Sequence, residues 1–422
     1  MILSNISTPL LGLVDTAVLG HLDSESFLAA VALGGLIFSF IFWGFGFLRM
    51  GTTGLTAQAF GENNKSEMNI ILGQAIILAI AISLLLLVSQ QIISKIAFSL
   101  LQSNLLVEQL ALQYFETRLL SAPATLILYV LMGWFLGQQN VRIPLFVVLI
   151  SNMINIFLDV LFVYHLDMKV EGVALATVIA EYVGLMFGLI IALRMARKKK
   201  AIWHWSDLFN IKQFKNMMLI NSHIFIRTWC LIFAFAFFSA QAAKMGAVVL
   251  AANTVLLNFQ TFMAYALDGF AHAAEALVGK AVGEKNKVML RQAIVTAGVW
   301  SGLVAVTFSV VYFYFGQVII DSLTSLSQVR EVAYIYLPWL IVMPIVSVAC
   351  YLMDGIFIGA MLSKQMRNTM LFSLFCVFLP AWYYSQTMGN KGLWLTMTLF
   401  MLARSVSMML VFKRTLIIEK CH

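Results

Sequence analysis

The chain has 422 residues, of which 61% are hydrophobic and only 11% are charged. A soluble domain carries about 25% charged residues, so this composition excludes a soluble globular protein and predicts an integral membrane protein. The formal net charge of +8 would also suit a nucleic-acid-binding protein, but no basic domain accompanies it and we expect no nucleic-acid partner.

Apolar runs of membrane-spanning length recur along the chain. A helical span needs about 20 predominantly apolar residues, and the period-two alternation of barrel strands is absent. The predicted spans are residues 2–20, 27–48, 68–90, 117–138, 143–165, 172–194, 216–240, 248–279, 290–316, 333–360, 368–387 and 392–412. The sequence therefore predicts an all-α membrane protein with twelve transmembrane helices.

The first span contains an acid and a proline, Asp15 and Pro9, in the stretch PLLGLVDTAVLG (9–20). A charged group at bilayer depth costs about 2.5 kcal/mol or more and usually marks a pathway or a site. Proline inside a helix removes a backbone donor and permits a bend. We expect Asp15 to take part in the functional site and Pro9 to supply a bend used in gating.

A polar stripe occupies the fifth span, ISNMINIFLDVLF (150–162), where Asn152, Asn155 and Asp159 are three and four residues apart and share one helix face. The next span adds Thr177 and, four residues later, Glu181. Burial disfavours a charged carboxylate, so such an acid can exchange a proton near neutral pH. The same oxygens could instead hold a dehydrated Na⁺, and both interpretations stay open.

These polar groups could also serve only to hydrogen-bond neighbouring helices. For Asn152 this structural role and a functional one are equally consistent with the sequence. For Asp15 and Asp159 we favour function, because an amide would join helices without the cost of burying a charge.

The second half of the chain repeats the first at an offset of 222 residues. The ungapped match over residues 28–65 gives ten identities in 38 positions, and MGWFLG (132–137) falls on DGIFIG (354–359). Six spans per repeat return the chain to its starting side, so the halves are parallel repeats related by an axis along the membrane normal. We expect an amino-terminal lobe (1–194), a basic cytoplasmic linker (195–214) and a carboxyl-terminal lobe (215–422).

The two halves differ in their polar residues. Asn155 and Asp159 fall on Val377 and Ala381, so the stripe belongs to the first half alone. The second half has its own intramembrane acids, which are accessory candidates: Asp268, Glu275 and Asp354. Met and aromatic side chains are adaptable apolar lining, and those considered for a substrate cavity are Met50, Trp134, Phe259, Met263, Tyr265 and Tyr351.

Lys and Arg are distributed unevenly between the predicted loops. With both termini on one side, 19 of the 27 fall on that side and five on the other. This asymmetry follows the positive-inside rule and predicts that both termini are cytoplasmic. The run RMARKKK (194–200) is then a topology anchor.

The motifs resemble those of the multidrug and toxic compound extrusion (MATE) family, in particular its DinF branch. The matching stretches are PLLGLVDTAVLGHLD (9–23), FLRMGTTGLTAQAFG (47–61), NIFLDV (155–160), ALATVIAEY (174–182), YALDGFAHAAEALVGKAVG (265–283) and YLMDGIFIGAMLSKQMRN (351–368). The resemblance implies a two-lobed exporter of the bacterial inner membrane, which exchanges H⁺ or Na⁺ for lipophilic, often cationic drugs.

By motif position, Asp15, Asn155, Asp159 and Thr177 match the family's amino-lobe cation site, and Asp354 matches an acidic position that other branches use. We expect H⁺ to be the main coupling ion, with Na⁺ able to occupy the same site. We expect a monomer in contact with membrane lipid, with no cofactor besides this ion.

Two alternatives remain. A flippase for lipid-linked saccharides shares the two-bundle plan, but it should line its cleft with several basic residues, and only Arg118, Arg227 and Arg404 lie at or near membrane depth. A membrane-embedded enzyme is a more distant alternative, because no HExxH, GxSxG or His/Cys cluster appears in the sequence.

Overall fold

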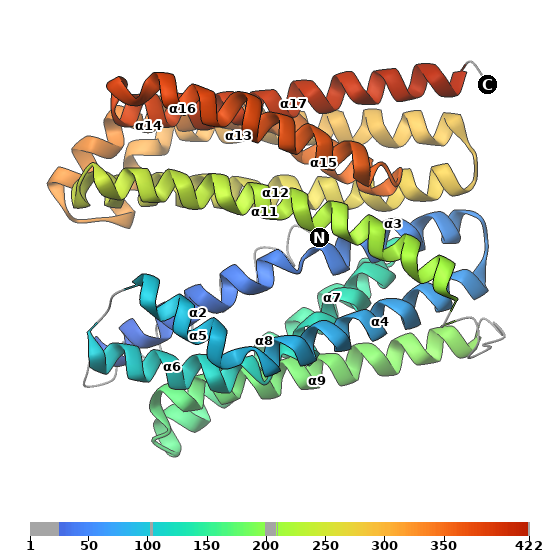
Figure 1. Cartoon of the computed structure of the whole chain (residues 1–422), viewed down its shortest axis with the longest axis horizontal. Helices are drawn as coiled ribbons and strands as arrows, with labels where there is room; N and C mark the ends of the chain where they lie inside the picture. The colour runs from blue at the N-terminus through green and yellow to red at the C-terminus, as the bar shows by residue number, and fades with distance from the viewer. Residues whose placement is uncertain (1–24, 102–103, 199–207, 209, 421–422) are drawn as a thin grey trace. The chain divides into compact units, whose positions relative to one another are not determined.

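The computed structural model describes the chain except for residues 1–24, 102–103, 199–207, 209 and 421–422. The chain falls into two compact units that divide between Met217 and Met218. All regular elements of the described residues are helical (Figure 1). The expected Asp15, Pro9 and first span lie outside the described residues.

Among the described residues, the first unit contains eight α-helices, one π-helical turn and the first turns of a helix that continues into the second unit. They are α2 (Glu25–Gly44), α3 (Phe47–Gly61), α4 (Lys65–Val88), α5 (Gln90–Leu101), α6 (Leu105–Leu119), α7 (Ala122–Gly137), α8 (Arg142–Val160), η1 (Leu161–His165), α9 (Lys169–Lys198) and the first turns of α11 (Ile211–Lys244).

The second unit contains the remainder of α11 and the helices that follow it. They are α12 (Ala247–Gly283), α13 (Lys287–Leu323), α14 (Ser327–Gly359), α15 (Ser363–Phe372), η2 (Ser373–Phe378), α16 (Leu379–Ser385), η3 (Gln386–Met388) and α17 (Asn390–Lys420). Its largest hydrophobic cluster is centred on buried side chains such as Phe238, Trp394 and Phe400.

Nine helices of the described residues are long and apolar enough to cross a membrane, and α6 with α7 adds a tenth if this pair, bent by 52°, is one span. Helix α6 begins well before the predicted start of that span at residue 117. Asn104 explains the earlier start, because its side chain caps the helix by accepting from Leu106 N. The expected span 368–387 is formed by α15, η2 and α16 in succession.

The repeat predicted at the offset of 222 is confirmed in helix packing. A Cβ added at Gly133 of α7 would collide with the carbonyl oxygen of Arg49 on α3. At the equivalent crossing in the second unit, a Cβ at Gly355 of α14 would collide with the carbonyl oxygen of Ala271 on α12. Glycine is thus required in both units, because two helix backbones approach each other at this point.

Local backbone geometry follows the same repeat. Asn64 caps α4 by accepting from Glu67 N at 3.0 Å, and its equivalent Asn286 caps α13 by accepting from Met289 N at 3.0 Å. Left-handed residues recur at the same offset: Asn63 (φ 55°) with Lys285 (φ 54°), and Gln139 (φ 60°) with Met361 (φ 57°).

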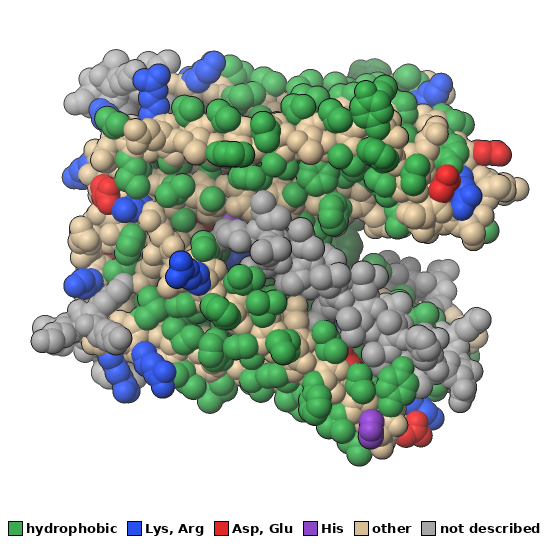
Figure 2. All heavy atoms as spheres, turned by 180° about the vertical axis from the view of Figure 1, so that it is seen from behind, with side chains coloured by type: hydrophobic (Ala, Val, Ile, Leu, Met, Phe, Trp, Pro, Cys, Tyr) green, Lys and Arg blue, Asp and Glu red, His purple; other side chains and the backbone are tan. Residues whose placement is uncertain are grey.

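The surface of each unit has the pattern of a protein that lies in lipid. Figure 2 shows hydrophobic side chains over the middle of the helices, whereas most of the charged side chains in view lie toward the helix ends. Large apolar side chains such as Leu85, Val88 and Phe313 are more than half exposed. Apolar surface of this extent is unfavourable in water, whereas it is stable in contact with the hydrocarbon core of a bilayer.

Candidate functional site

The polar stripe of α8 meets α9 in the interior of the first unit. Asn155, Asp159 and Thr177 are 1%, 0% and 2% exposed. The Asn155 amide lies between the other two, 3.1 Å from Asp159 Oδ2 and 3.1 Å from Thr177 Oγ1. With its nitrogen donating to the carboxylate and its oxygen accepting from Thr177, both ends of the amide are satisfied. Three of the four residues predicted for the cation site are therefore in contact.

The backbone around this site departs from a regular α-helix. The π-helical turn η1 begins two residues after Asp159. Such turns are rare and frequently occur at functional sites. Asn152, on the same helix, is half-buried. The Thr177 hydroxyl also lies 3.0 Å from the carbonyl oxygen of Val173. Its one proton can go to either acceptor, and the Thr177 backbone N–H, 3.3 Å from the Asn155 oxygen, serves that oxygen in both cases.

Glu181 belongs to a second group of polar side chains, which we call the Glu181 cluster. It accepts hydrogen bonds from Thr125 and Ser121, which flank the start of α7. Arg118, at the end of α6, interacts electrostatically with Glu181. Arg118 also donates to the hydroxyl of Tyr114, and its guanidinium group stacks over the ring of Phe38. The cluster thus joins α9 to the bend between α6 and α7.

In the second unit, two arginines converge on one acid. Arg227 of α11 and Arg404 of α17 both donate to Asp354 Oδ2 on α14, the latter at 2.9 Å. The exposed fractions of Arg227, Asp354 and Arg404 are 6%, 6% and 1%. Asp268 of α12 also interacts electrostatically with Arg227. These four side chains carry two positive and two negative formal charges, so the group is neutral overall.

Other residues considered from the sequence lie in different surroundings. Glu275 of α12 is 1% exposed. Its backbone carbonyl oxygen lies where α12 closely approaches Gly359 of α14. Trp134 is fully buried, and its indole donates to the Met68 carbonyl oxygen at 2.9 Å. Phe259 and Met263 belong to hydrophobic clusters of the second unit.

Met50, Tyr265 and Tyr351 are half-buried. Tyr351 packs against the same clusters and interacts electrostatically with Asp268. Assignment of these residues to a substrate cavity stays a prediction.

The sequence analysis did not predict that Arg227 and Arg404 both contact Asp354. Residues 227, 354 and 404 are far apart in the chain, and no spacing rule connects them. One signal was present: intramembrane arginines require acidic partners, and the second half offers three acids for two arginines. The hydroxyls of Ser121 and Thr125 gave no comparable signal, because Ser and Thr are common within membrane helices.

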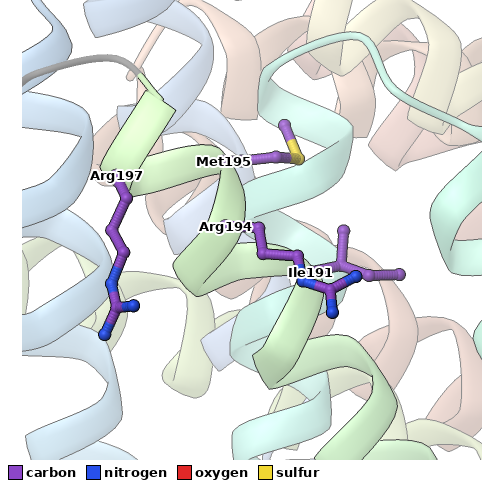
Figure 3. A pocket seen from close by; sticks show the side chains of 4 residues that line it. All are labelled: Ile191, Arg194, Met195 and Arg197. Atoms are coloured by element: carbon purple, nitrogen blue, oxygen red, sulfur yellow. The ribbon is translucent and has the colours of Figure 1, made fainter.

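A cavity of about 430 Å³ lies at the carboxyl end of α9, lined by Ile191, Arg194, Met195 and Arg197 (Figure 3). Arg194 follows Thr177 by more than four helical turns, or about 25 Å along the axis. This cavity is therefore separate from the Asp159 site.

Solved structures define the class of fold. A MATE transporter in complex with MaD3S has a TM-score of 0.88 and 19% sequence identity, covering 100% of this chain and 95% of the other. The bent form of the Vibrio cholerae MATE transporter VcmN has a TM-score of 0.85 and 22% identity, covering 100% and 95%. The chain is thus an all-helical, multi-span membrane protein with the MATE fold.

Sequence comparisons give the family. The MatE family model matches residues 1–161 and 224–383. DNA damage-inducible protein F of Escherichia coli (strain K12) is 41% identical over 426 residues, covering 98% of this chain and 90% of that protein. A probable multidrug resistance protein NorM of Thermotoga maritima is 26% identical over 339 residues, covering 78% and 71%. The chain belongs to the MATE family of transporters, is a homologue of bacterial DinF, and is not an enzyme.

Proposed function

We propose that the chain is a cation-coupled multidrug efflux antiporter, which exports lipophilic, often cationic compounds by alternating access. One observation carries the proposal: Asn155, Asp159 and Thr177 form a buried, hydrogen-bonded group in a membrane-spanning unit. Burying a carboxylate at this depth is expensive, and such residues mark ion pathways. The similarity to a probable multidrug resistance protein supports the choice of cargo.

H⁺ is the coupling ion that these residues favour. A proton needs one carboxylate, and Asp159 provides it in a site from which water is largely excluded. A Na⁺ ion needs about six oxygen ligands, as hard cations do. The Asn155 amide is already engaged at both ends, so Na⁺ would have to displace its hydrogen bonds. Na⁺ at Asp15, Asn155, Asp159 and Thr177 remains the second candidate for the ion.

The arginines of the second unit support a drug exporter over a flippase for lipid-linked saccharides. A pyrophosphate-linked lipid needs basic side chains that are available to the phosphates. Arg227 and Arg404 instead donate to Asp354, and Asp268 acts on Arg227 as well. Their charges are already compensated within the protein.

We further propose that residues 1–194 and 215–422 act as two lobes joined by the basic linker 195–214. In this proposal the protein is a monomer of the bacterial inner membrane with both termini in the cytoplasm. The excess of Lys and Arg on one side of the predicted topology supports this orientation.

The test uses the purified protein in proteoliposomes with ethidium, a lipophilic cation, as the transported probe. We expect an acidic lumen to drive ethidium uptake in Na⁺-free buffer, and we expect Asp159→Asn to abolish it. Asp167→Asn is the matched control, because Asp167 is exposed and its left-handed φ of 52° also suits Asn.

If a Na⁺ gradient at clamped pH drives uptake and a pH gradient does not, the coupling ion is Na⁺ and not H⁺. Full activity of Asp159→Asn would remove Asp159 from the coupling site.

A further inference from the structure

Glu181 lies near the middle of the membrane. Helix α9 begins at the cationic Lys169, and Arg194 is the first of the basic residues near its other end at Lys198. At 1.5 Å per residue, Glu181 is about 18 Å from Lys169 and about 20 Å from Arg194 along the helix axis. Cationic side chains at helix ends belong at the level of the lipid headgroups, about 40 Å apart across a bilayer. A carboxylate midway between them is at the depth where ionisable residues serve ion and proton pathways.

The Glu181 cluster continues directly from the Asp159 site. Thr177 and Glu181 are one helical turn apart on the same face of α9, which places their Cβ atoms about 6 Å apart. Thr177 contacts Asn155, and Asn155 contacts Asp159. The polar side chains therefore form a seam from Asp159 through Asn155 and Thr177 to Glu181, whose last step is one helical turn of α9.

A serine extends the same seam toward the carboxyl end of α9. Ser151 Oγ of α8 lies against Gly184, at the place where a Cβ of that glycine would stand. This oxygen is buried and makes no hydrogen bond to any residue that the structure describes. A buried hydroxyl with a free lone pair and proton is suited to bond a water that carries protons.

The surroundings of Glu181 tolerate both charge states of its carboxyl group. Helix α6 presents Arg118 and Tyr114, and the start of α7 presents the hydroxyls of Ser121 and Thr125. Helix α9 itself carries Tyr182, and Asp159 of α8 is the next acid, beyond Thr177 and Asn155.

When Glu181 is ionised, Arg118 compensates its charge. When Glu181 is neutral, Arg118 keeps its hydrogen bond to Tyr114 and its stacking over Phe38, 4.3 Å from the ring centre. Asp354 differs in this respect, because its neutralisation would leave two buried guanidinium groups without their shared acceptor.

We propose that Glu181 is the second proton-carrying residue of the first unit, and this proposal rests on the proposed function. The proton that leaves the Asp159 carboxyl group passes along the seam to the Glu181 carboxylate. Asp159 becomes a carboxylate and Glu181 a neutral acid, so the number of protons and the total charge are unchanged. Glu181 thereby connects the Asp159 site to the middle of the membrane on the side of Arg194.

The experiment separates proton coupling from substrate movement. Ethidium is again the probe, and each variant is assayed twice in proteoliposomes: uptake driven by an acidic lumen, and exchange of ethidium across the membrane at equal pH. Glu181→Gln keeps the size and hydrogen-bonding capacity of the side chain but cannot carry a proton. We expect it to lose the pH-driven uptake and to retain exchange.

Glu181→Asp restores a proton-carrying group and should recover part of the pH-driven uptake. Glu171→Gln, the same change at an exposed position on the first turn of α9, should behave like the unchanged protein.

Two outcomes would overturn the role of Glu181. One is wild-type pH-driven uptake, with an unaltered pH profile, in Glu181→Gln. The other is loss of uptake and exchange together without recovery in Glu181→Asp, which indicates a residue that only supports the fold. If the unchanged protein moves ethidium under neither gradient, the proposed function itself fails, and this proposal fails with it.

Discussion

At the scale of single residues, the shared carboxylate of Asp354 is the most sensitive charge in the second unit. Replacing it by Asn leaves Arg227 and Arg404 buried with one acid nearby, Asp268. Removing one partner of a buried ion pair costs about 3–5 kcal/mol, because the remaining charge is uncompensated. We therefore expect Asp354→Asn to lower the thermal unfolding temperature in detergent markedly, measured by intrinsic fluorescence.

Two further variants test this explanation. Asp321 forms a surface ion pair with Arg330 at 3.4 Å, so Asp321→Asn should change the free energy of unfolding by no more than about 1 kcal/mol. Adding Arg404→Gln to Asp354→Asn removes the surplus positive charge and should restore part of the lost stability. A double variant that is less stable than Asp354→Asn alone would contradict the charge argument.

Some contacts of the candidate site could be predicted from the sequence and others could not. Asn155, Asp159 and Thr177 were predictable, because i, i+4 spacing fixes a shared helix face and apolar flanks make polar residues conspicuous. The two arginines on Asp354 were not, because three helices distant in sequence must pack before these charges meet. From the sequence, Glu181 was an accessory candidate that shares a helix face with Thr177. In the structure Glu181 accepts hydrogen bonds from hydroxyls on and beside α7, which no periodicity in α9 could indicate.

At the scale of elements, helix crossings depend on glycine at two equivalent positions. A side chain at Gly355 would collide with the Ala271 carbonyl oxygen, a backbone atom that cannot move without displacing α12. Overpacking of this kind costs about 1–3 kcal/mol. We expect Gly355→Ala to lower the thermal unfolding temperature of the protein in detergent.

Gly302 of α13 is the matched control, since no atom lies within 4 Å of an added Cβ there. Alanine also has a higher helix propensity than glycine by about 1 kcal/mol, so Gly302→Ala should leave the unfolding temperature equal or higher. Equal stability of the two alanine variants would show that the close approach of α12 and α14 does not constrain the fold.

The predicted windows located most of the long apolar helices in the described residues, yet they missed α5 (Gln90–Leu101), which lies between two windows, and they could not give helix ends. Helix α3 continues the run that ends near residue 48 through a less hydrophobic stretch, FLRMGTTGLTAQAFG, whose small and hydroxyl residues are buried against α7. A hydropathy window detects side chains that face lipid, and it misses these residues because they pack against protein. Helix α6 escaped the windows for another reason, because charged residues such as Glu108 and Arg118 lower its hydropathy before the bend.

At the scale of the whole molecule, the repeat was the most informative sequence signal. It appeared as ten identities in 38 positions, four of which (Gly61, Glu62, Asn64 and Lys65) lie together at the turn before α4, and Gly133 matches Gly355 at the same offset. The structure explains this distribution, because the caps Asn64 and Asn286 and the crossings at Gly133 and Gly355 have the same geometry in each unit. Apolar positions can exchange one hydrophobic residue for another, whereas caps and close crossings cannot.

The charge distribution of the whole chain predicts its orientation, which labelling can test. The α12–α13 turn contains Lys285 and is flanked by Lys280 and Lys287, and it falls on the Lys- and Arg-rich side of the predicted topology. Residues 324–326 join α13 to α14 at the opposite end of α13. Because basic loops are retained in the cytoplasm, a cysteine at Ser325 should react with a membrane-impermeant maleimide in intact cells. A cysteine at Glu284 should react only after the membrane is opened. Both are introduced into a chain whose four native cysteines are replaced by serine. The reverse labelling pattern would place both termini outside the cytoplasm and would invert the direction of transport inferred for the Asp159 site.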